Sequence, residues 1–377
     1  MGADAIHSAE DARRLARRRL PWMVFDYIDG AAGTEHGEAL NRAALRDLRL
    51  RPRVLRNVTK RDLSCAVFGH GARVPFGITP MGMCNLSTPG ADLMLARLAA
   101  RDRVPLGVST VASTPLERMI EVAEGHAWFQ LYFSGDGSGT MALVDRARAA
   151  GYQTLVVTLD VPEVGRRPRE LRHGFKMPFK IGPRQFVDFA LHPRWSLGTL
   201  WHGKPEMANF RQGGFDRTAS RAAADWSYLD RLRAAWPGKL VIKGVLDVED
   251  AVRLRDAGVD AIQVSSHGGR QLDGAPEPIL MLAEIRAALG PDFPLFFDSG
   301  LRSGEDIVKA HAMGANFAFL GRPLLYAMAA GGERGLHHLW EVMTEEVSLT
   351  LAQLGRTDMF GLADTVQKIG RVGMAET

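Results

Sequence analysis

The chain has 377 residues, which is enough for two average domains or for one large α/β barrel. Hydrophobic residues make up 46% of the chain and charged residues 24%, and these values exclude a disordered, collagen-like or coiled-coil protein. The 47 basic and 43 acidic residues leave a net charge of only +4, so we expect no nucleic-acid partner.

The number of cysteines and the composition of the N-terminus indicate the cellular compartment of the protein. Cys65 and Cys84 are too few for a zinc cage or a disulfide framework, and we expect no metal site. No run of 18 apolar residues occurs, and residues 1–19 are polar and arginine-rich without an apolar signal segment. We therefore expect a cytoplasmic protein.

Residues 1–75 show helical periodicity followed by an irregular passage. Arginines gather between residues 13 and 19, and Leu15 and Leu20 mark the opposite, apolar side. We interpret the arginines as the solvated face of a first helix. We expect this N-terminal segment, residues 1–75, to be helical and to pack on a barrel formed by residues 76–377.

From residue 76 onward, short apolar runs alternate with longer amphipathic stretches, which is the pattern of repeated βα units. The predicted strands are 76–82, 106–110, 127–133, 154–160, 240–245, 261–266, 295–300 and 316–322. The predicted helices are 91–101, 115–124, 140–150, 247–257, 278–289 and 304–313. Eight parallel strands with right-handed helical crossovers predict a (β/α)₈ TIM barrel, and an open doubly wound sheet is the alternative.

A long insertion, about residues 163–225, interrupts the repeat after the fourth strand. It has several prolines near its start and few clear periodic elements, so we expect a loop or lid on the carboxyl face of the barrel. Its apolar residues are Phe186, Phe189, Leu191, Trp195, Leu197, Leu200 and Trp201, set among basic residues. This pattern indicates either an interfacial apolar patch or a loop that packs on its own barrel or on a neighbouring subunit.

Polar residues stand at the ends of the otherwise apolar strands, where a barrel has its active site. They are Gln130, Tyr132, Thr158, Asp160, Lys243, Ser265, His267, Arg270, Asp298 and Arg322. The most informative stretch is Ser-Ser-His-Gly-Gly-Arg-Gln-Leu-Asp at 265–273, which predicts a base, His267, beside an anion-binding fork, Arg270. Asp160 from another strand would fix the imidazole tautomer and stabilise the imidazolium. The alternative is a capped histidine in a structural turn.

Glycines and arginines follow the last two strands, at the usual phosphate site of this fold. They occur in Asp-Ser-Gly-Leu-Arg-Ser-Gly at 298–304 and Leu-Gly-Arg-Pro at 320–323. This pattern favours a phosphorylated cofactor or substrate over surface helix caps. Lys243 lies in an apolar strand, where an unpaired ammonium is costly. It would form a Schiff base, pair with a carboxylate or stabilise negative charge on a cofactor.

These motifs, in this order, resemble the FMN-dependent α-hydroxy acid dehydrogenase and oxidase family, which includes glycolate oxidase, L-lactate dehydrogenase and L-mandelate dehydrogenase. The resemblance runs from Leu20 to about Gly355 and rests mainly on Ser-x-His-Gly-x-Arg-Gln-Leu-Asp. Phe-Gln-Leu-Tyr, Thr-x-Asp, Lys-Gly-Val, Asp-x-Gly-x-Arg and Gly-Arg-Pro accompany it in register. Residues 192–197 and 351–355 resemble mandelate dehydrogenase more than glycolate oxidase.

The resemblance implies a role for each matching residue. The implied catalytic residues are His267 as the base, Asp160 as its partner, Arg270 and Arg167 for the substrate carboxylate, and Tyr132 and Tyr27 as hydrogen-bond partners of the substrate. The implied FMN-binding residues are Pro80, Met81, Gly82, Ser109, Gln130, Thr158, Lys243, Ser265, Asp298, Ser299, Gly300, Arg302, Gly321 and Arg322. Lys243 would then favour the electron-rich reduced flavin.

The implied reaction is FMN-dependent oxidation of a small L-2-hydroxy acid, mandelate- or lactate-like, to the 2-oxo acid. His267 would remove either the α-proton or the hydroxyl proton. Gly82, where several oxidases of the family carry alanine, favours a dehydrogenase that passes electrons to a quinone or another acceptor. An oxidase that releases hydrogen peroxide and a non-catalytic barrel that binds a phosphorylated ligand are the alternatives.

The resemblance also concerns partners. It implies a homo-oligomer, a tetramer or an octamer, and a peripheral contact with the inner face of the cell membrane, or with a quinone, through residues 180–215. Ser266, Val111 and Pro168 depart from the usual residues of the family, and these departures bear on the identity of the substrate.

Overall fold

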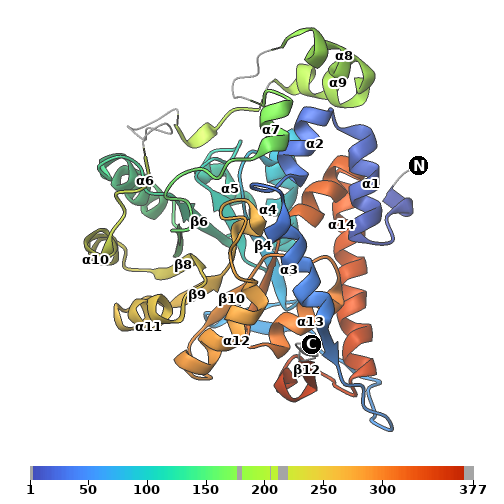
Figure 1. The fold of residues 1–377 in the computed structure, drawn as a ribbon, viewed down its shortest axis with the longest axis vertical. Helices are drawn as coiled ribbons and strands as arrows, with labels where there is room; N and C mark the ends of the chain where they lie inside the picture. The colour runs from blue at the N-terminus through green and yellow to red at the C-terminus, as the bar shows by residue number, and fades with distance from the viewer. Residues whose placement is uncertain (1–2, 176–180, 204, 211–219, 369–377) are drawn as a thin grey trace, which may run out of the picture.

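The computed structural model describes residues 3–175, 181–203, 205–210 and 220–368. Its centre is a closed barrel of parallel strands in the order β10-β11-β4-β5-β6-β7-β8-β9 (Figure 1). The strands are β4 (Phe76–Met81), β5 (Leu106–Ser109), β6 (Ala127–Leu131), β7 (Thr154–Thr158), β8 (Lys239–Val245), β9 (Ala261–Val264), β10 (Leu295–Phe297) and β11 (Phe317–Leu320). All the predicted strands are present, so the (β/α)₈ barrel is confirmed and the open sheet is wrong.

Helices surround the barrel because each strand buries both of its faces. They are α4 (Ala91–Asp102), α5 (Leu116–Val122), α6 (Ser138–Ala149), α10 (Trp226–Ala235), α11 (Val248–Asp256), α12 (Pro278–Leu289), α13 (Gly304–Ala312) and α14 (Arg322–Gln353). Each of the predicted helices is found, with small differences at the ends. The sequence analysis did not identify α14, in which Gly332 adopts a non-helical conformation (φ +60°) that interrupts the periodicity.

The insertion after β7 is more regular than its sequence predicted. Its described part contains α7 (Pro168–Arg172), α8 (Pro183–Leu191), α9 (Pro193–His202) and the 3₁₀ turn η3 (Ala208–Phe210). A proline occupies the start of α7, α8 and α9, where its missing N–H has no helical partner to lose. The expectation of few periodic elements was therefore wrong, because these prolines start helices.

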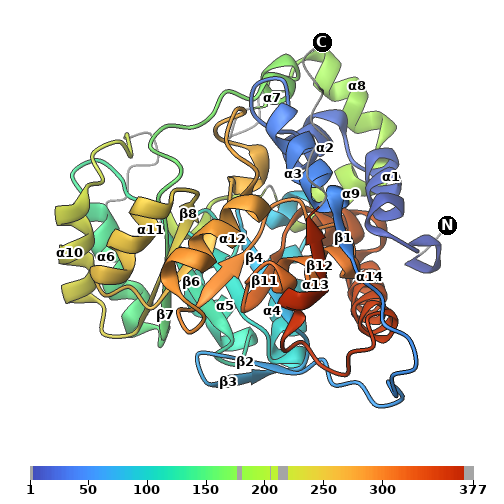
Figure 2. The ribbon, with the colours of Figure 1, turned by 60° about the horizontal axis from the view of Figure 1, so that its bottom comes forward.

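The N-terminal segment packs along one side of the barrel (Figures 1 and 2). It contains the 3₁₀ turn η1 (Ala3–Ala5) and the helices α1 (Ala9–Arg19), α2 (Trp22–Asp29) and α3 (His36–Asp47). Strand β1 (Leu48–Leu50) pairs antiparallel with β12 (Val366–Lys368), which follows the 3₁₀ turn η5 (Leu362–Thr365). The division of the chain at residue 75 stays a prediction.

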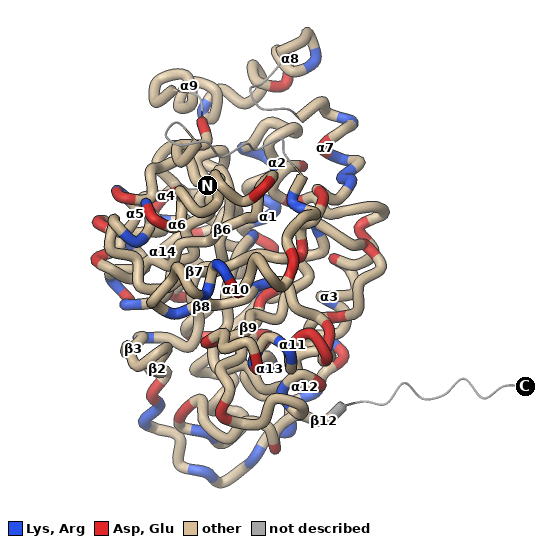
Figure 3. Tube along the Cα trace, turned by 90° about the vertical axis from the view of Figure 1, so that its left-hand side faces the viewer, with Lys and Arg blue, Asp and Glu red and all other residues tan. Residues whose placement is uncertain are grey.

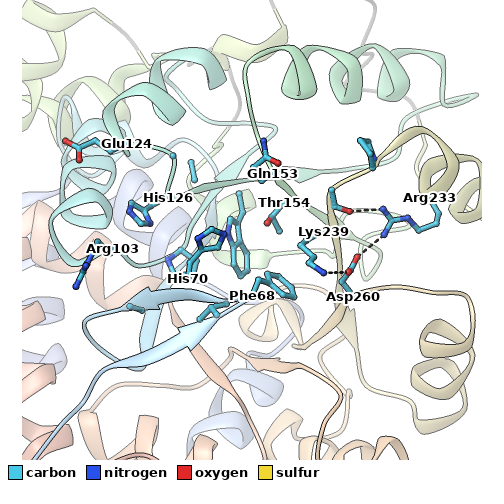
Figure 4. A pocket seen from close by; sticks show the side chains of 18 of the residues that line it. Phe68, His70, Arg103, Glu124, His126, Gln153, Thr154, Arg233, Lys239 and Asp260 are labelled. Atoms are coloured by element: carbon cyan, nitrogen blue, oxygen red, sulfur yellow. Dashed lines mark hydrogen bonds and ion pairs between the residues drawn. The ribbon is translucent and has the colours of Figure 1, made fainter.

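The amino-terminal mouth of the barrel is covered by a hairpin of β2 (Cys65–Val67) and β3 (His70–Ala72). Phe68 at its turn contacts the rings of Trp128 and Phe296, both at 5.5 Å between centroids. A cavity of about 660 Å³ lies beside this hairpin (Figure 4). There Asp260 accepts hydrogen bonds from Lys239 and Arg233 at 2.8 and 2.9 Å. These paired charges at the amino-terminal mouth fit a role in stability.

Candidate active site

A cavity of about 320 Å³ opens at the carboxyl ends of the barrel strands, within the usual range for small-molecule sites. The predicted residues that line it are Tyr27, Pro80, Met81, Gly82, Tyr132, Arg167, Lys243, His267, Arg270, Asp298, Ser299, Gly300, Arg302, Gly321 and Arg322. Asp160 is not part of the lining but bonds to His267. Ser109, Gln130, Thr158 and Ser265 also lie outside the lining.

His267 follows β9 in the short turn η4 (His267–Gly269) and points toward Asp160. The distance from His267 Nδ1 to Asp160 Oδ1 is 3.0 Å. The backbone of His267 is in the left-handed region (φ +56°), which is uncommon for a residue with a side chain and is often found at functional sites. The turn therefore directs Nδ1 of the imidazole against the carboxylate, and Nε2 has no hydrogen-bond partner among the described residues, so it can serve as a base.

Asp160 is positioned by a glycine that the sequence analysis did not identify. Gly244 in β8 has φ +98°, and a Cβ atom at this position would lie 2.4 Å from Asp160 Cγ. A register shift between Lys243 and Val245 marks the same place in the strand pairing. Oδ2 of Asp160 is buried and has no hydrogen-bond partner among the described residues. The carboxylate is therefore committed to His267 through its other oxygen.

Arg167 and Arg270 converge on one carboxylate. Glu170 Oε1 accepts from Arg270 Nη2 at 2.9 Å and from Arg167 Nη1 at 3.3 Å. Arg270 Nη1 also donates to the carbonyl oxygens of Tyr27 and Gly30, at 2.9 and 2.6 Å. Because two guanidiniums meet at a carboxylate oxygen, the pair is arranged to bind a carboxylate. The sequence analysis did not identify Glu170.

The protonation of these groups follows from burial and neighbouring charge. Burial lowers the pKa of His267, and Asp160 opposes this shift, while Lys243 adds to it. Burial and the nearby Arg167 lower the pKa of Arg270 to about 10. At neutral pH the imidazole is therefore mainly unprotonated and the guanidinium charged, which are the forms that a base and a carboxylate ligand require.

Two tyrosines flank the substrate half of the cavity. Tyr27 stacks on Phe175 with ring centroids 4.4 Å apart, and the guanidinium carbon of Arg221 lies 4.3 Å from the centroid of the Tyr132 ring. Burial raises the pKa of both hydroxyls, that of Tyr132 to about 12. Both side chains therefore remain neutral at physiological pH and can donate a hydrogen bond.

Lys243 pairs with a buried carboxylate, which is one of the three roles that the sequence left open. Its Nζ donates to Ser265 Oγ at 2.6 Å and lies 3.1 Å from Asp298 Oδ2. Thr79 Oγ1 and Gln263 Nε2 also donate to this oxygen, each at 2.8 Å. Burial opposes ionisation of Asp298, but Lys243 and the hydroxyl donors keep its pKa below its ordinary value. The side chain of Lys243 is thus held at the cavity wall by an ion pair and a hydrogen bond.

The strand-end polar residues outside the lining form a buried chain of hydrogen bonds. Ser109 Oγ donates to Gln130 Oε1 at 3.1 Å, and Gln130 Nε2 donates to Thr158 Oγ1 at 3.0 Å. These three side chains come from the adjacent strands β5, β6 and the end of β7. Their contacts fix the polar groups beneath the cavity rather than leave them free.

At the other end of the cavity, Arg302 and Arg322 converge on a second internal carboxylate. Glu38 Oε1 lies 3.0 Å from Arg302 Nη2 and 3.8 Å from Arg322 Nη2. Burial and the neighbouring Arg322 both lower the pKa of Arg302. The backbone of Ser299 and Gly300 is left-handed, with φ +87° and +96°. Two crowded guanidiniums that already share one anion fit the phosphate end of FMN.

Gly82 does not border open space on its side-chain side. A Cβ atom at this position would lie 2.3 Å from Cγ2 of Val111, while Gly82 itself lines the cavity. The glycine makes room for Val111, which lines the same wall.

A cluster of acidic side chains holds α7, and with it the Arg167–Glu170 pair, against the N-terminal helices. Arg169 Nη1 lies 2.9 Å from Asp29 Oδ2 and 3.2 Å from Asp26 Oδ1, and its Nε lies 2.5 Å from Glu35 Oε1. This ion-pair network ties the insertion to α2 across more than 130 residues of sequence. The sequence analysis did not identify Arg169 or its partners.

Comparisons with known proteins agree with this geometry. Residues 16–368 match the family of FMN-dependent dehydrogenases. The chain is 38% identical over 375 residues to the (S)-mandelate dehydrogenase of Pseudomonas putida, a match that covers 97% of this chain and 95% of that protein. It is 39% identical over 341 residues to the 4-hydroxymandelate oxidase of Amycolatopsis orientalis, with 90% of this chain and 92% of that protein covered.

The fold is shared as well. The crystal structure of the monotopic membrane protein (S)-mandelate dehydrogenase superposes with a TM-score of 0.91 at 38% identity, covering 97% of this chain and 100% of that chain. The family match spans most of the chain and confirms the resemblance inferred from the motifs. The cavity, with a cationic end suited to a phosphate and a His–Asp pair near its other end, fits the cofactor of that family. The chain therefore belongs to the FMN-dependent dehydrogenases, and its cofactor is FMN.

Proposed function

We propose that the protein oxidises a small L-2-hydroxy acid, mandelate- or lactate-like, to the corresponding 2-oxo acid. One arrangement supports this most directly. The His267–Asp160 pair and the convergent guanidiniums of Arg167 and Arg270 belong to one site. A base beside a carboxylate-binding fork is what a 2-hydroxy acid requires, because its reacting C–H and O–H groups lie next to its carboxylate.

The residues assigned to FMN divide by chemistry. Arg302 and Arg322, with the turn at Ser299 and Gly300 and the nearby Gly321, would bind the phosphate and the adjoining chain. Pro80, Met81 and Gly82 would border the ring, while Lys243 would supply a positive charge and Asp298 would keep that lysine in place. Ser109, Gln130, Thr158 and Ser265 would bind or support the ring from below. When bound, FMN supplies the two-electron acceptor for the substrate.

His267 acts as the base in this proposal. It removes either the α-proton or the hydroxyl proton, and both steps need the imidazole in the same place. Asp160 then stabilises the imidazolium through the 3.0 Å contact to Nδ1. Arg167 and Arg270 bind the substrate carboxylate, and Tyr27 and Tyr132 donate hydrogen bonds to the substrate.

The cofactor and the substrate class are tested together. The purified holoenzyme should be yellow, and lactate or mandelate should bleach it without oxygen. His267→Gln should retain the bound flavin but lose about 10²-fold or more of the rate of flavin reduction. A colourless protein that cannot be reconstituted with FMN, or a yellow one that no 2-hydroxy acid reduces, would contradict the proposal.

The electron acceptor is a separate part of the proposal. We infer a dehydrogenase that passes electrons to a quinone or another acceptor, on the sequence argument from Gly82. The alternative is an oxidase. The test compares reduction of a quinone analogue with hydrogen peroxide formation during turnover in air. Peroxide formed in step with substrate would favour the oxidase.

A peripheral contact with the inner face of the cell membrane is supported by α8 and α9. These helices project from one end of the molecule and carry few charged positions (Figure 3). Leu200 and Trp201 are 81% and 88% exposed, and Phe186, Leu191 and Leu197 are exposed as well. Exposed apolar groups of this density indicate an interaction surface. Residues 180, 204 and 211–215 of the predicted contact lie outside the described residues.

Vesicle flotation tests this contact. No helix among the described residues is long and apolar enough to cross a bilayer. Replacing Leu200 and Trp201 together by Ser should abolish binding of the holoenzyme to anionic vesicles. Phe360→Ser is the matched control, because Phe360 is 73% exposed but belongs to a different part of the chain. If the double variant still binds the vesicles, the membrane contact through α8 and α9 is wrong. The exposed apolar surface would then be explained by self-association in the predicted tetramer or octamer.

A further inference from the structure

Arg221 is a cation in the site to which neither the reaction nor FMN assigns a role. It precedes α10 at the end of the insertion, and its backbone N–H donates to the carbonyl of Pro162 at 3.2 Å. Its guanidinium carbon lies 4.3 Å from the centroid of the Tyr132 ring, and the side chain lines the same cavity as His267. Arg221 therefore belongs to the substrate half of the cavity.

The charge of Arg221 is not balanced in the way that the other cavity cations are. Arg167 and Arg270 share Glu170, Arg302 and Arg322 share Glu38, and Lys243 pairs with Asp298. Within the described part of the chain, no carboxylate forms an ion pair with Arg221. The nearby Glu163 accepts a hydrogen bond from Ser220 Oγ at 2.6 Å instead.

Burial makes this arrangement costly. Arg221 is half-buried, and burial lowers its pKa, which only the weaker influences of Tyr132 and Glu163 oppose. The face of the Tyr132 ring partly offsets the lost hydration, but it satisfies none of the guanidinium's N–H donors. Among the described residues, no group accepts a hydrogen bond from this guanidinium, and such a half-buried cation in a substrate cavity is a site for an anion.

The surroundings of Arg221 define where that anion would lie. The cavity is also lined by the apolar side chains of Val111, Val161, Val164 and Met207 and by Gln271. Arg221, Val161 and Gln271 also border an adjoining cavity of about 870 Å³. A substituent on the substrate thus has room beside Arg221, and Arg221 offers its outer end a positive charge.

We propose that Arg221 binds a second carboxylate, at the far end of the substrate, so that the preferred substrate is a short L-2-hydroxy dicarboxylic acid. This inference rests on the proposed oxidation of 2-hydroxy acids and narrows it. Arg167 and Arg270 take the carboxylate next to the hydroxyl group, and Arg221 takes the distal one. The planar guanidinium matches a carboxylate with two parallel hydrogen bonds, which an amide or a methyl group cannot reproduce.

The test compares a distal acid with its neutral isostere. Anaerobic flavin reduction of the holoenzyme is measured with L-2-hydroxyglutarate and with the same compound carrying a distal amide. We expect the wild type to favour the acid by about 10- to 100-fold in kcat/KM. Arg221→Gln should bring this ratio close to one, and Arg221→Lys should restore part of it. Arg253→Gln is the matched control, because Arg253 stacks on Trp226 at 3.8 Å but does not line the cavity, and it should leave the ratio unchanged.

Binding without turnover gives a second readout. Titration calorimetry on the oxidised holoenzyme should show that 2-oxoglutarate binds about tenfold or more tightly than 2-oxobutyrate, and Arg221→Gln should remove that difference. If Arg221→Gln weakens acid and amide equally, Arg221 only supports the Tyr132 ring and the inference is wrong. Reduction by lactate without any preference for the distal acid overturns this inference alone. If no 2-hydroxy acid reduces the flavin, both the proposed function and this inference fail.

Discussion

Replacing Asp160 by Asn removes a charge from the His267 pair while it preserves the shape of the side chain. Oδ2 of Asp160 is buried and has no hydrogen-bond partner among the described residues, so the new amide breaks no existing bond there. Oδ1 can still accept from His267 Nδ1 at about the present 3.0 Å. The substitution therefore tests the charge of Asp160 rather than the packing around it.

The structure gives the size of the effect. Two unit charges 3.0 Å apart attract by about 5 kcal/mol at an effective dielectric constant near 20, or about four powers of ten in rate as an upper limit. The imidazole carries only part of its charge in the transition state, and the carboxylate keeps some contact with solvent. We therefore expect Asp160→Asn to slow flavin reduction by about 10²- to 10³-fold.

The dependence of kcat/KM on pH tests the same substitution independently, through the direction in which the pKa of His267 moves. Because Asp160 raises the pKa of His267, its removal should lower that pKa further. The imidazole must be unprotonated to act as a base, so kcat/KM rises with pH through the pKa of His267. The acidic limb, which we expect below the ordinary histidine value of about 6.5 in the wild type, should move to lower pH in the variant.

Stopped-flow measurement of anaerobic flavin reduction across pH reports both effects. The control is Asp188→Asn, since Asp188 Oδ1 lies 3.2 Å from His192 Nδ1 outside the cavity, while that Nδ1 hydrogen-bonds to the backbone carbonyl of Asp188. The control should change neither the rate nor the acidic limb. A rate within threefold of the wild type for Asp160→Asn, or an acidic limb that moves upward, would refute the assigned roles of the pair.

Three further substitutions test other parts of the site. Gly244→Ala places a Cβ atom at a position with φ +98°, so it should lower the free energy of unfolding by about 1–3 kcal/mol and slow flavin reduction. Urea unfolding and stopped flow measure these two effects, and unchanged values would argue against a positioning role for Gly244. Gly82→Ala should lower the free energy of unfolding of the protein by about 1–3 kcal/mol, because the new methyl clashes with Val111. Combining it with Val111→Ala removes the clash, so the double variant should lose less stability than the two single variants lose together. Glu170→Gln removes a negative charge that raises the pKa of Arg270. Because loss of the charge on Arg270 should weaken substrate binding at high pH, the alkaline limb of kcat/KM should move below about pH 10 in the variant. A movement of this limb to higher pH would contradict the assigned role.

The periodicity of the chain was enough to predict the barrel. Its strands are short apolar runs flanked by glycine-terminated helices, and these are local properties that do not depend on distant residues. The same local reasoning failed in the insertion, where the prolines near its start were interpreted as a sign of irregular structure although Pro168 begins α7, and where α8 and α9, which also begin at prolines, were not identified. It also missed α14, where Gly332 interrupts the pattern.

The residues of the site also divide into those that the sequence identified and those that it did not. His267 and Arg270 stand in one contiguous motif at a strand end, so their residue types and spacing were sufficient to select them. The partners Glu170 and Glu38 carry no such motif. Glu38 meets Arg302 across 264 residues of sequence, and nothing in the neighbourhood of either residue predicts the contact.

The amino-acid order alone therefore determined where the barrel strands form, that they close into a barrel, and which strand ends carry reactive groups, because these follow from short-range patterns of polarity. Only the closed tertiary structure decided that Gly244 must lack a side chain beside Asp160, and that two internal carboxylates, Glu170 and Glu38, each pair with two of the cavity arginines. It also decided that Arg221 lines the same cavity without an ion pair to any carboxylate that the structure describes. Such contacts join residues that come together only when the barrel closes, and charge balance depends on distance in space rather than on distance along the chain.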